Sequence, residues 1–146
     1  MREAILICYQ DDLCMRSILE FLEKVRYRVE TARAMRDIIQ KVRTGDIDVV
    51  LLEDDIEGVE ASDIVRLLKK IETRIQIIAI SSEESLSSAR RLRSAGIFYQ
   101  AMKPVDLEEV KAAVECAFEK IGRETLGKGS FSFFHRGSAP ALAEGV

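Results

Sequence analysis

Short apolar runs alternate with amphipathic stretches along most of this chain, and this alternation constrains its fold more than any other feature. The most strongly apolar run spans residues 47–52, and similar runs occupy 4–8, 75–80 and 97–102. Runs without regular polar alternation are typical of strands that are buried on both faces. Residues 27–31 alternate instead, which indicates a strand at the edge of a sheet.

Each run is followed by apolar residues at helical spacing. The expected helices begin their apolar stripes near Cys14, Met35, Ile64, Leu86 and Leu107. Asp11 and Asp12 precede the first helix and Asp106 precedes the last, where a carboxylate can accept hydrogen bonds from free backbone N–H groups. These features predict five strand-then-helix units.

Five such units predict an α/β fold, a doubly wound five-stranded parallel sheet of the (βα)5 type with helices on both faces. In open sheets of this class, ligands and chemistry are found at the carboxyl ends of the strands. Glu53 and Lys103 each follow a predicted strand, and Ser81 ends another. We therefore expect these three side chains to lie together at one edge of the sheet.

Composition restricts the classes of protein that fit. The 146 residues suffice for one domain, and the net charge of −3 gives no general attraction to nucleic acid. No segment reaches the roughly 18 apolar residues of a membrane span. The three cysteines show no CxxC spacing, which favours reduced thiols. We expect a cytoplasmic protein that binds neither nucleic acid nor a membrane.

The composition changes near residue 122. We expect residues 1–122 to form the domain and residues 123–146 to form a C-terminal tail, because Gly and Ser become frequent there. Three aromatic residues, Phe131, Phe133 and Phe134, interrupt this tail. These aromatic residues would either dock on the domain or on a partner, or have no role, and both alternatives remain open.

The strand-end residues and the Lys103-Pro104 pair before the last helix resemble the receiver domain of bacterial two-component response regulators (CheY-like). The resemblance covers about residues 3–120 and implies the sheet order 2-1-3-4-5. It places Glu53 at the phosphoacceptor position, and Ser81 and Lys103 at the switch-hydroxyl and phosphate-binding positions. It also implies a cis peptide bond before Pro104.

The chain departs from the receiver pattern at several of these positions. The family's phosphoacceptor is an aspartate, whereas this chain has Glu53, and Tyr9 and Gln10 stand where two acids hold magnesium. Gln100 replaces the switch aromatic. Asp11 and Asp54 are only weak candidates for a shifted metal site, so we expect no cofactor and doubt Mg²⁺ binding.

The resemblance implies signal transduction through protein contacts rather than enzyme activity. The expected partners are a histidine kinase or a downstream signalling protein, or a second copy of the chain through the face of the fourth helix, fifth strand and fifth helix. The departures predict an atypical, degenerate receiver that works without aspartyl phosphorylation. Two alternatives remain open: an active phosphoacceptor with a shifted metal site, and a flavodoxin-like module that binds a small ligand.

Two local features also have two interpretations each. A Glu53–Lys103 ion pair would either imitate the phosphorylated contact or merely satisfy a partly buried charge. The acidic segment from residue 53 to 60 would either bind a cation or form a solvated acidic rim, and the second is favoured because the spacing lacks a recognised calcium-loop pattern.

Overall fold

A computed structural model describes residues 4–10, 12–82 and 85–126. Its main sheet has five parallel strands in the order β2-β1-β3-β6-β7. The strands are β1 (Ala4–Cys8), β2 (Arg28–Ala32), β3 (Val49–Leu52), β6 (Gln76–Ser81) and β7 (Tyr99–Met102). Two further short strands, β4 (Asp55–Ile56) and β5 (Val59–Glu60), pair only with each other as an antiparallel hairpin. Apart from this hairpin, the strand order is the predicted 2-1-3-4-5.

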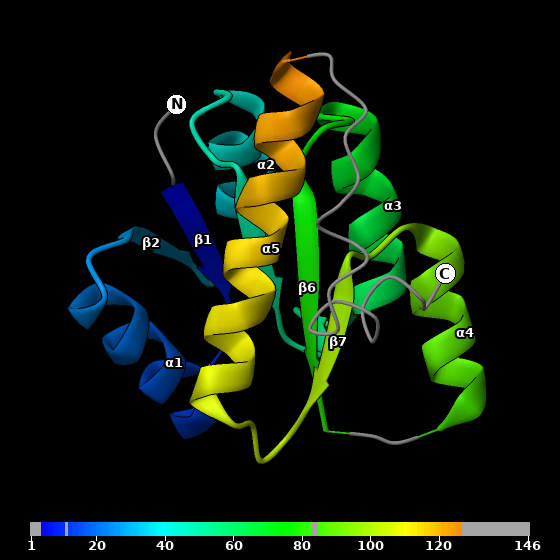
Figure 1. Cartoon of the computed structure of the whole chain (residues 1–146). Coiled ribbons are helices and arrows are strands. Elements are labelled where there is room, and N and C mark those ends of the chain that lie inside the picture. Colours follow the sequence, from blue (N-terminus) through cyan, green and yellow to red (C-terminus); the bar gives the residue numbers. More distant parts are fainter. Residues whose placement is uncertain (1–3, 11, 83–84, 127–146) are drawn as a thin grey trace.

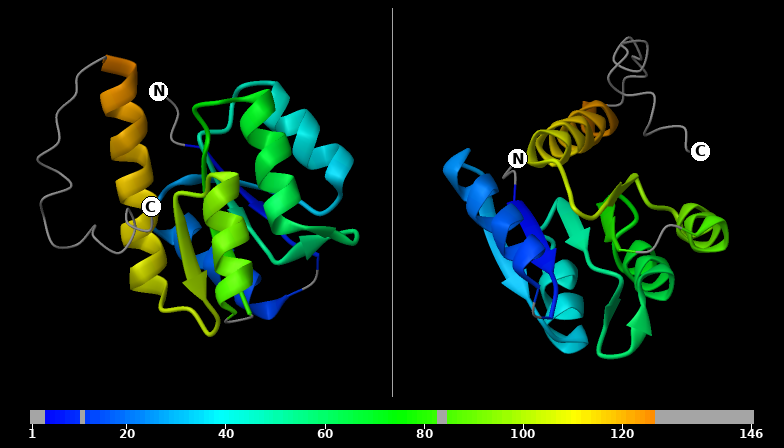
Figure 2. Two further views of the ribbon diagram at one scale, coloured as in Figure 1. Left: turned by 90° about the vertical axis from the view of Figure 1, so that its right-hand side faces the viewer. Right: turned by 90° about the horizontal axis from the view of Figure 1, so that it is seen from below.

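Five helices cover the two faces of this sheet. They are α1 (Leu13–Lys24), α2 (Met35–Arg43), α3 (Ala61–Ile71), α4 (Leu86–Ala95) and α5 (Leu107–Leu126). Helices α1 and α5 lie on one face, and α2, α3 and α4 lie on the other (Figures 1 and 2). The predicted α/β doubly wound fold is confirmed.

The apolar core has two halves because successive strand side chains point to opposite faces. In β1, Leu6 packs with α2, α3 and α4, whereas Ile5 and Ile7 pack with α1 and α5. Strands β3 and β6 divide in the same way. This double burial explains why the central strands are continuous apolar runs in the sequence.

Helix α5 continues to Leu126, so the first four residues of the predicted tail, 123–126, are helical. The rest of that segment, with Phe131, Phe133 and Phe134, lies outside the described residues. Within the described part of the chain, none of the helices is sufficiently long and apolar to cross a bilayer.

Candidate functional site

The register of the sheet brings the predicted strand-end residues to one edge. The backbone N–H of Glu53 donates to the carbonyl of Cys8 at 3.1 Å, which aligns the ends of β3 and β1. The backbone N–H of Lys103 donates to the carbonyl of Ser81 at 2.8 Å, which aligns the ends of β7 and β6. The Lys103-Pro104 peptide bond is cis, as the family resemblance implies.

Lys103 lies between two carboxylates. Its ammonium group donates a hydrogen bond to Asp12 Oδ2 and lies 3.5 Å from Glu53 Oε2. The three side chains are only 15–20% exposed: 18% for Lys103, 20% for Asp12 and 15% for Glu53. The site is therefore a partly buried cluster of one positive and two acidic groups.

The protonation behaviour of the two acids differs because their surroundings differ. Burial opposes ionisation of Asp12, but hydrogen bonds with Lys103, with Glu53 and with the backbone N–H of Cys14 outweigh it and lower the Asp12 pKa to about 2. Burial raises the pKa of Glu53, and the nearby Asp12 carboxylate raises it further against the opposing effects of Gln10 and Lys103. Asp12 is thus the carboxylate that Lys103 holds most firmly.

Burial alone would lower the pKa of Lys103. The hydrogen bond to Asp12 and the charges of both carboxylates outweigh that effect, and the net result is a raised pKa. The ammonium group is therefore charged, and it is already engaged by acids of the same chain.

Gln10, which the resemblance places at one of the family's acidic positions, links three loops. Its backbone N–H donates to Glu53 Oε1 at 2.9 Å, and its side-chain oxygen accepts from the backbone N–H of Glu57 at 2.9 Å. Its side-chain amide donates to the carbonyl of Arg33 at 3.3 Å, and Arg33 Nε returns a bond to the Gln10 carbonyl at 2.9 Å. The loops after β1, β2 and β3 are joined through this one residue.

The turn of the β4–β5 hairpin extends the same network. Glu57 and Gly58 both have positive φ, at 52° and 81°, a conformation that suits glycine and strains most other residues. Glu57 is held there because its N–H is bonded to Gln10 and its own Oε1 accepts from the backbone N–H of Met35 at 3.0 Å. That second bond satisfies a free donor at the N-terminus of α2, whose N-cap residue makes no side-chain bond.

Tyr9, which the resemblance places at the other acidic position, is only 6% exposed and packs with the α1 and α5 side of the core. The Arg33 guanidinium lies over its ring, with the guanidinium carbon 5.4 Å from the ring centroid. A phenol supplies no carboxylate oxygen, and the amide of Gln10 is committed to Arg33 and Glu57. These residues do not fit a magnesium site.

The remaining predicted residues join neighbouring strand ends. Gln100 Nε2 donates to Ser81 Oγ at 3.0 Å, which links β7 to the end of β6. Asp54 accepts from the backbone N–H of Ser82 at 3.1 Å and from its hydroxyl, which links the loops after β3 and β6. Tyr99, one place before Gln100, donates its hydroxyl to Glu109 of α5 instead.

Sequence reasoning missed the contact between Lys103 and Asp12. Asp12 was expected as a helix-capping acid, and it is the N-cap of α1, accepting from the backbone N–H of Cys14 at 2.7 Å. Its second oxygen reaches Lys103 across the sheet edge. The contact could have been predicted because Asp12 follows the carboxyl end of β1 in the sequence, at the same sheet edge as Lys103. Asp11 lies outside the described residues, and no cluster of three potential metal ligands occurs within residues 4–10, 12–82 and 85–126.

An open parallel sheet that carries a carboxylate, a hydroxyl and a lysine at adjacent strand ends is the arrangement that the resemblance to receiver domains implies. The model of the response regulator receiver domain family matches residues 5–115. The chain therefore belongs to this family. Its members are the receiver domains of two-component systems, and they act as signalling modules.

Individual proteins that carry receiver-type names are also similar to this chain. The chain is 29% identical over 119 residues to sporulation initiation phosphotransferase F of Bacillus subtilis (strain 168), with 79% of this chain and 93% of that protein covered. It is 26% identical over 118 residues to the DNA-binding transcriptional regulator NtrC of Azospirillum brasilense, with 80% of this chain but only 24% of that protein covered. A CheY-like response regulator receiver domain protein from Methanospirillum hungatei JF-1 has a TM-score of 0.78 at 20% identity, with coverage of 85% and 99%. The last likeness concerns the fold alone.

Proposed function

We propose that this chain is an atypical receiver module that transmits a signal through protein–protein contacts without aspartyl phosphorylation. The observation that carries the proposal is the engagement of Lys103. Its ammonium group is bonded to Asp12 and lies 3.5 Å from Glu53. An incoming phosphoryl group would have to compete with both carboxylates for this cation.

The network around Gln10 supports the same proposal. Phosphoryl transfer depends on placing the reacting groups in line and on neutralising the developing negative charge. Tyr9 and Gln10 remove two carboxylates that would hold a metal cation, and Glu53 carries its carboxylate one C–C bond, roughly 1.5 Å, further from the backbone than an aspartate. The loops are already joined to one another without a phosphoryl group.

The proposed partners are a histidine kinase or a downstream signalling protein. The proposed working surface is formed by α4, β7 and α5, and it also offers a route to a homodimer. Strand β7 is an edge strand of the sheet, and Ile97, Phe98 and Tyr99 at its start are only half-buried. The Gln100–Ser81 bond connects this edge to the candidate site.

The main alternative function is that of an active phosphoacceptor with a shifted acidic pair. The position of Asp12 supports this alternative, because its carboxylate lies beside Glu53. Intact-mass spectrometry after incubation with magnesium and a small-molecule phosphodonor separates the two functions. The native chain is compared with Glu53→Asp, and with a triple variant that combines Tyr9→Asp, Gln10→Asp and Glu53→Asp. Far-UV circular dichroism checks that each variant is folded.

We expect no phosphoryl adduct on the native chain, and an adduct on the triple variant that proves the donor is effective. A result for Glu53→Asp alone then separates the effect of the longer side chain from that of the missing acids. An adduct on the native chain would refute the proposal and establish the alternative function.

A further inference from the structure

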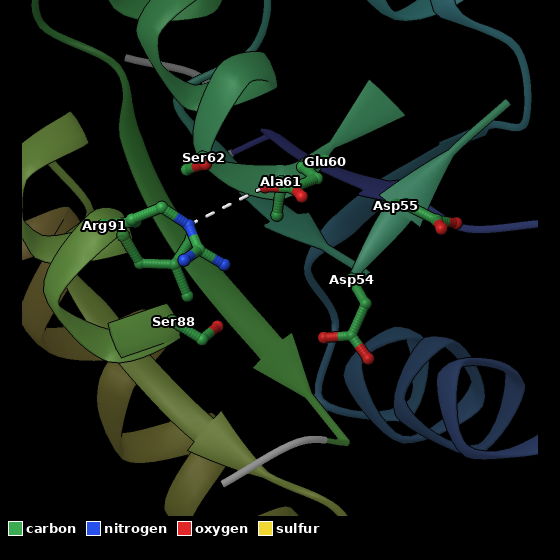
Figure 3. Close-up of a pocket in the computed structure, with 8 residues that line it drawn as sticks. Asp54, Asp55, Glu60, Ala61, Ser62, Ser88 and Arg91 are labelled. Carbon is green, nitrogen blue, oxygen red and sulfur yellow. Dashed lines mark ion pairs between the residues drawn. The ribbon is translucent and has the colours of Figure 1, made fainter. Parts of the chain in front are cut away.

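A surface pocket of about 220 Å³ lies between the N-terminal end of α3 and the middle of α4 (Figure 3). Its polar lining consists of Asp54, Asp55, Glu60, Ser62, Ser88 and Arg91. Asp54 directly follows Glu53 of the Lys103 cluster, so the pocket adjoins that cluster, but none of the pocket side chains contacts Lys103 in the described structure.

The pocket carries an excess of negative charge. Among the described residues that line it, three carry carboxylates and only Arg91 carries a guanidinium group. Figure 3 shows the Arg91 side chain reaching from α4 toward Glu60. The lining is therefore complementary to a cation, and a cationic side chain of the chain itself already lies at the pocket.

The Arg91–Glu60 pair is weak. Its Nε–Oε1 distance is 3.7 Å, and the side chains are 51% and 63% exposed. Exposed pairs with such geometry contribute little to stability, since water screens them. A second guanidinium from outside can therefore replace Arg91 without a large loss.

Ser62 gives an independent indication of a ligand. It lies in the first turn of α3 and is only 5% exposed, yet its hydroxyl makes no hydrogen bond to any described residue. Buried hydroxyl groups nearly always have a partner. A ligand that donates N–H groups into the pocket would supply one.

The volume restricts the occupant. Sites for whole metabolites usually measure about 300–1,000 Å³, so a pocket of about 220 Å³ holds the end of one side chain more readily than a complete small molecule. A guanidinium has a fork of N–H donors that matches carboxylates and a hydroxyl at once. We propose that the α3–α4 pocket binds an arginine side chain of a protein partner, which displaces Arg91 from Glu60.

This inference goes beyond the proposed function and is independent of phosphorylation. The test is a titration of the ¹⁵N-labelled chain of 146 residues with Nα-acetyl-arginine amide, in which amide chemical shifts are monitored. The matched probe is Nα-acetyl-citrulline amide, which has nearly the same shape and no charge. We expect saturable changes in the amide chemical shifts of Ser62, Ser88 and Arg91 with the arginine probe, and none with the citrulline probe.

Variants test the named contacts. Arg91→Ala removes the competing cation and should tighten binding about twofold to fivefold, whereas Glu60→Gln should weaken binding by a similar factor. Arg90→Ala and Asp63→Asn make the same changes of charge at nearby residues that do not line the pocket. Ser62→Ala should weaken binding without lowering the free energy of unfolding.

Equal shifts with the citrulline probe would overturn the proposal. So would an equal effect of Arg90→Ala and Arg91→Ala, because binding would then follow the general charge of the surface rather than the pocket. Phosphorylation of the native chain would refute the proposed function and leave this result unchanged.

Discussion

Replacement of Lys103 by methionine tests how strongly the site depends on its one cation. Lys103→Met keeps most of the side-chain volume but leaves Asp12 and Glu53 beside each other without a positive partner. Removing one partner of a fully buried pair costs about 3–5 kcal/mol. The side chains here are 15–20% exposed, so water offsets part of the loss, and we expect the free energy of unfolding to fall by about 2 kcal/mol near neutral pH.

This loss should depend on pH in a definite direction. In the native chain, the hydrogen bonds with Lys103, Glu53 and the Cys14 backbone together lower the Asp12 pKa to about 2, and Lys103 has the largest effect of the three. Asp12 therefore contributes stability above its ordinary pKa of about 4 that is lost as the pH falls toward 2. The raised pKa of Glu53 has the opposite effect on stability. The folded state holds the Glu53 proton more tightly than the unfolded state does, so the free energy of unfolding falls as the pH rises through that pKa. Without Lys103 both acids bind protons more readily, so the difference between native chain and variant should shrink between about pH 7 and pH 4.

Urea unfolding followed by far-UV circular dichroism at several pH values measures this difference. Lys41→Met is the matched control, because Lys41 pairs with Glu30 at 3.1 Å in a more exposed setting, with side chains 38% and 32% exposed. The control should cost no more than about 0.5 kcal/mol. A Lys103→Met loss that equals the control, or that does not change with pH, would refute the reasoning.

Two further changes test the loops around the cluster. Asp12→Asn keeps a side-chain acceptor for the N-terminus of α1 but loses the charge facing Lys103, whereas Asp12→Ala loses both. In urea unfolding, Asp12→Ala should be less stable than Asp12→Asn by about 1 kcal/mol. Equal stability of the two variants would mean that the cap contributes nothing. Gln10→Ala removes the bonds to Glu57 and Arg33, and should cost about 1–2 kcal/mol and speed hydrogen exchange at the amides of Glu57 and Met35. Unchanged exchange at both amides would show that Gln10 does not hold these loops.

Some details of the loops could not be predicted from the sequence. The β4–β5 hairpin occupies a segment expected only as an acidic loop, because two-residue strands show no periodicity. Its turn depends on positive φ at Glu57 as well as Gly58. The Glu57 N–H there donates to the side-chain oxygen of Gln10, which lies 47 residues away in the sequence. The pocket between α3 and α4 likewise exists only once the two helices pack side by side.

Local patterns in the sequence were sufficient to predict the sheet and the edge that carries the site. Hydrophobic periodicity is a local property, and parallel topology then requires the strand ends that carry Glu53, Ser81 and Lys103 to meet at one edge. The bonding partners of these side chains became visible only in the folded structure. Lys103 meets Asp12 across a separation of 91 residues, and such contacts depend on loop conformations that non-local hydrogen bonds and packing fix after the sheet has formed.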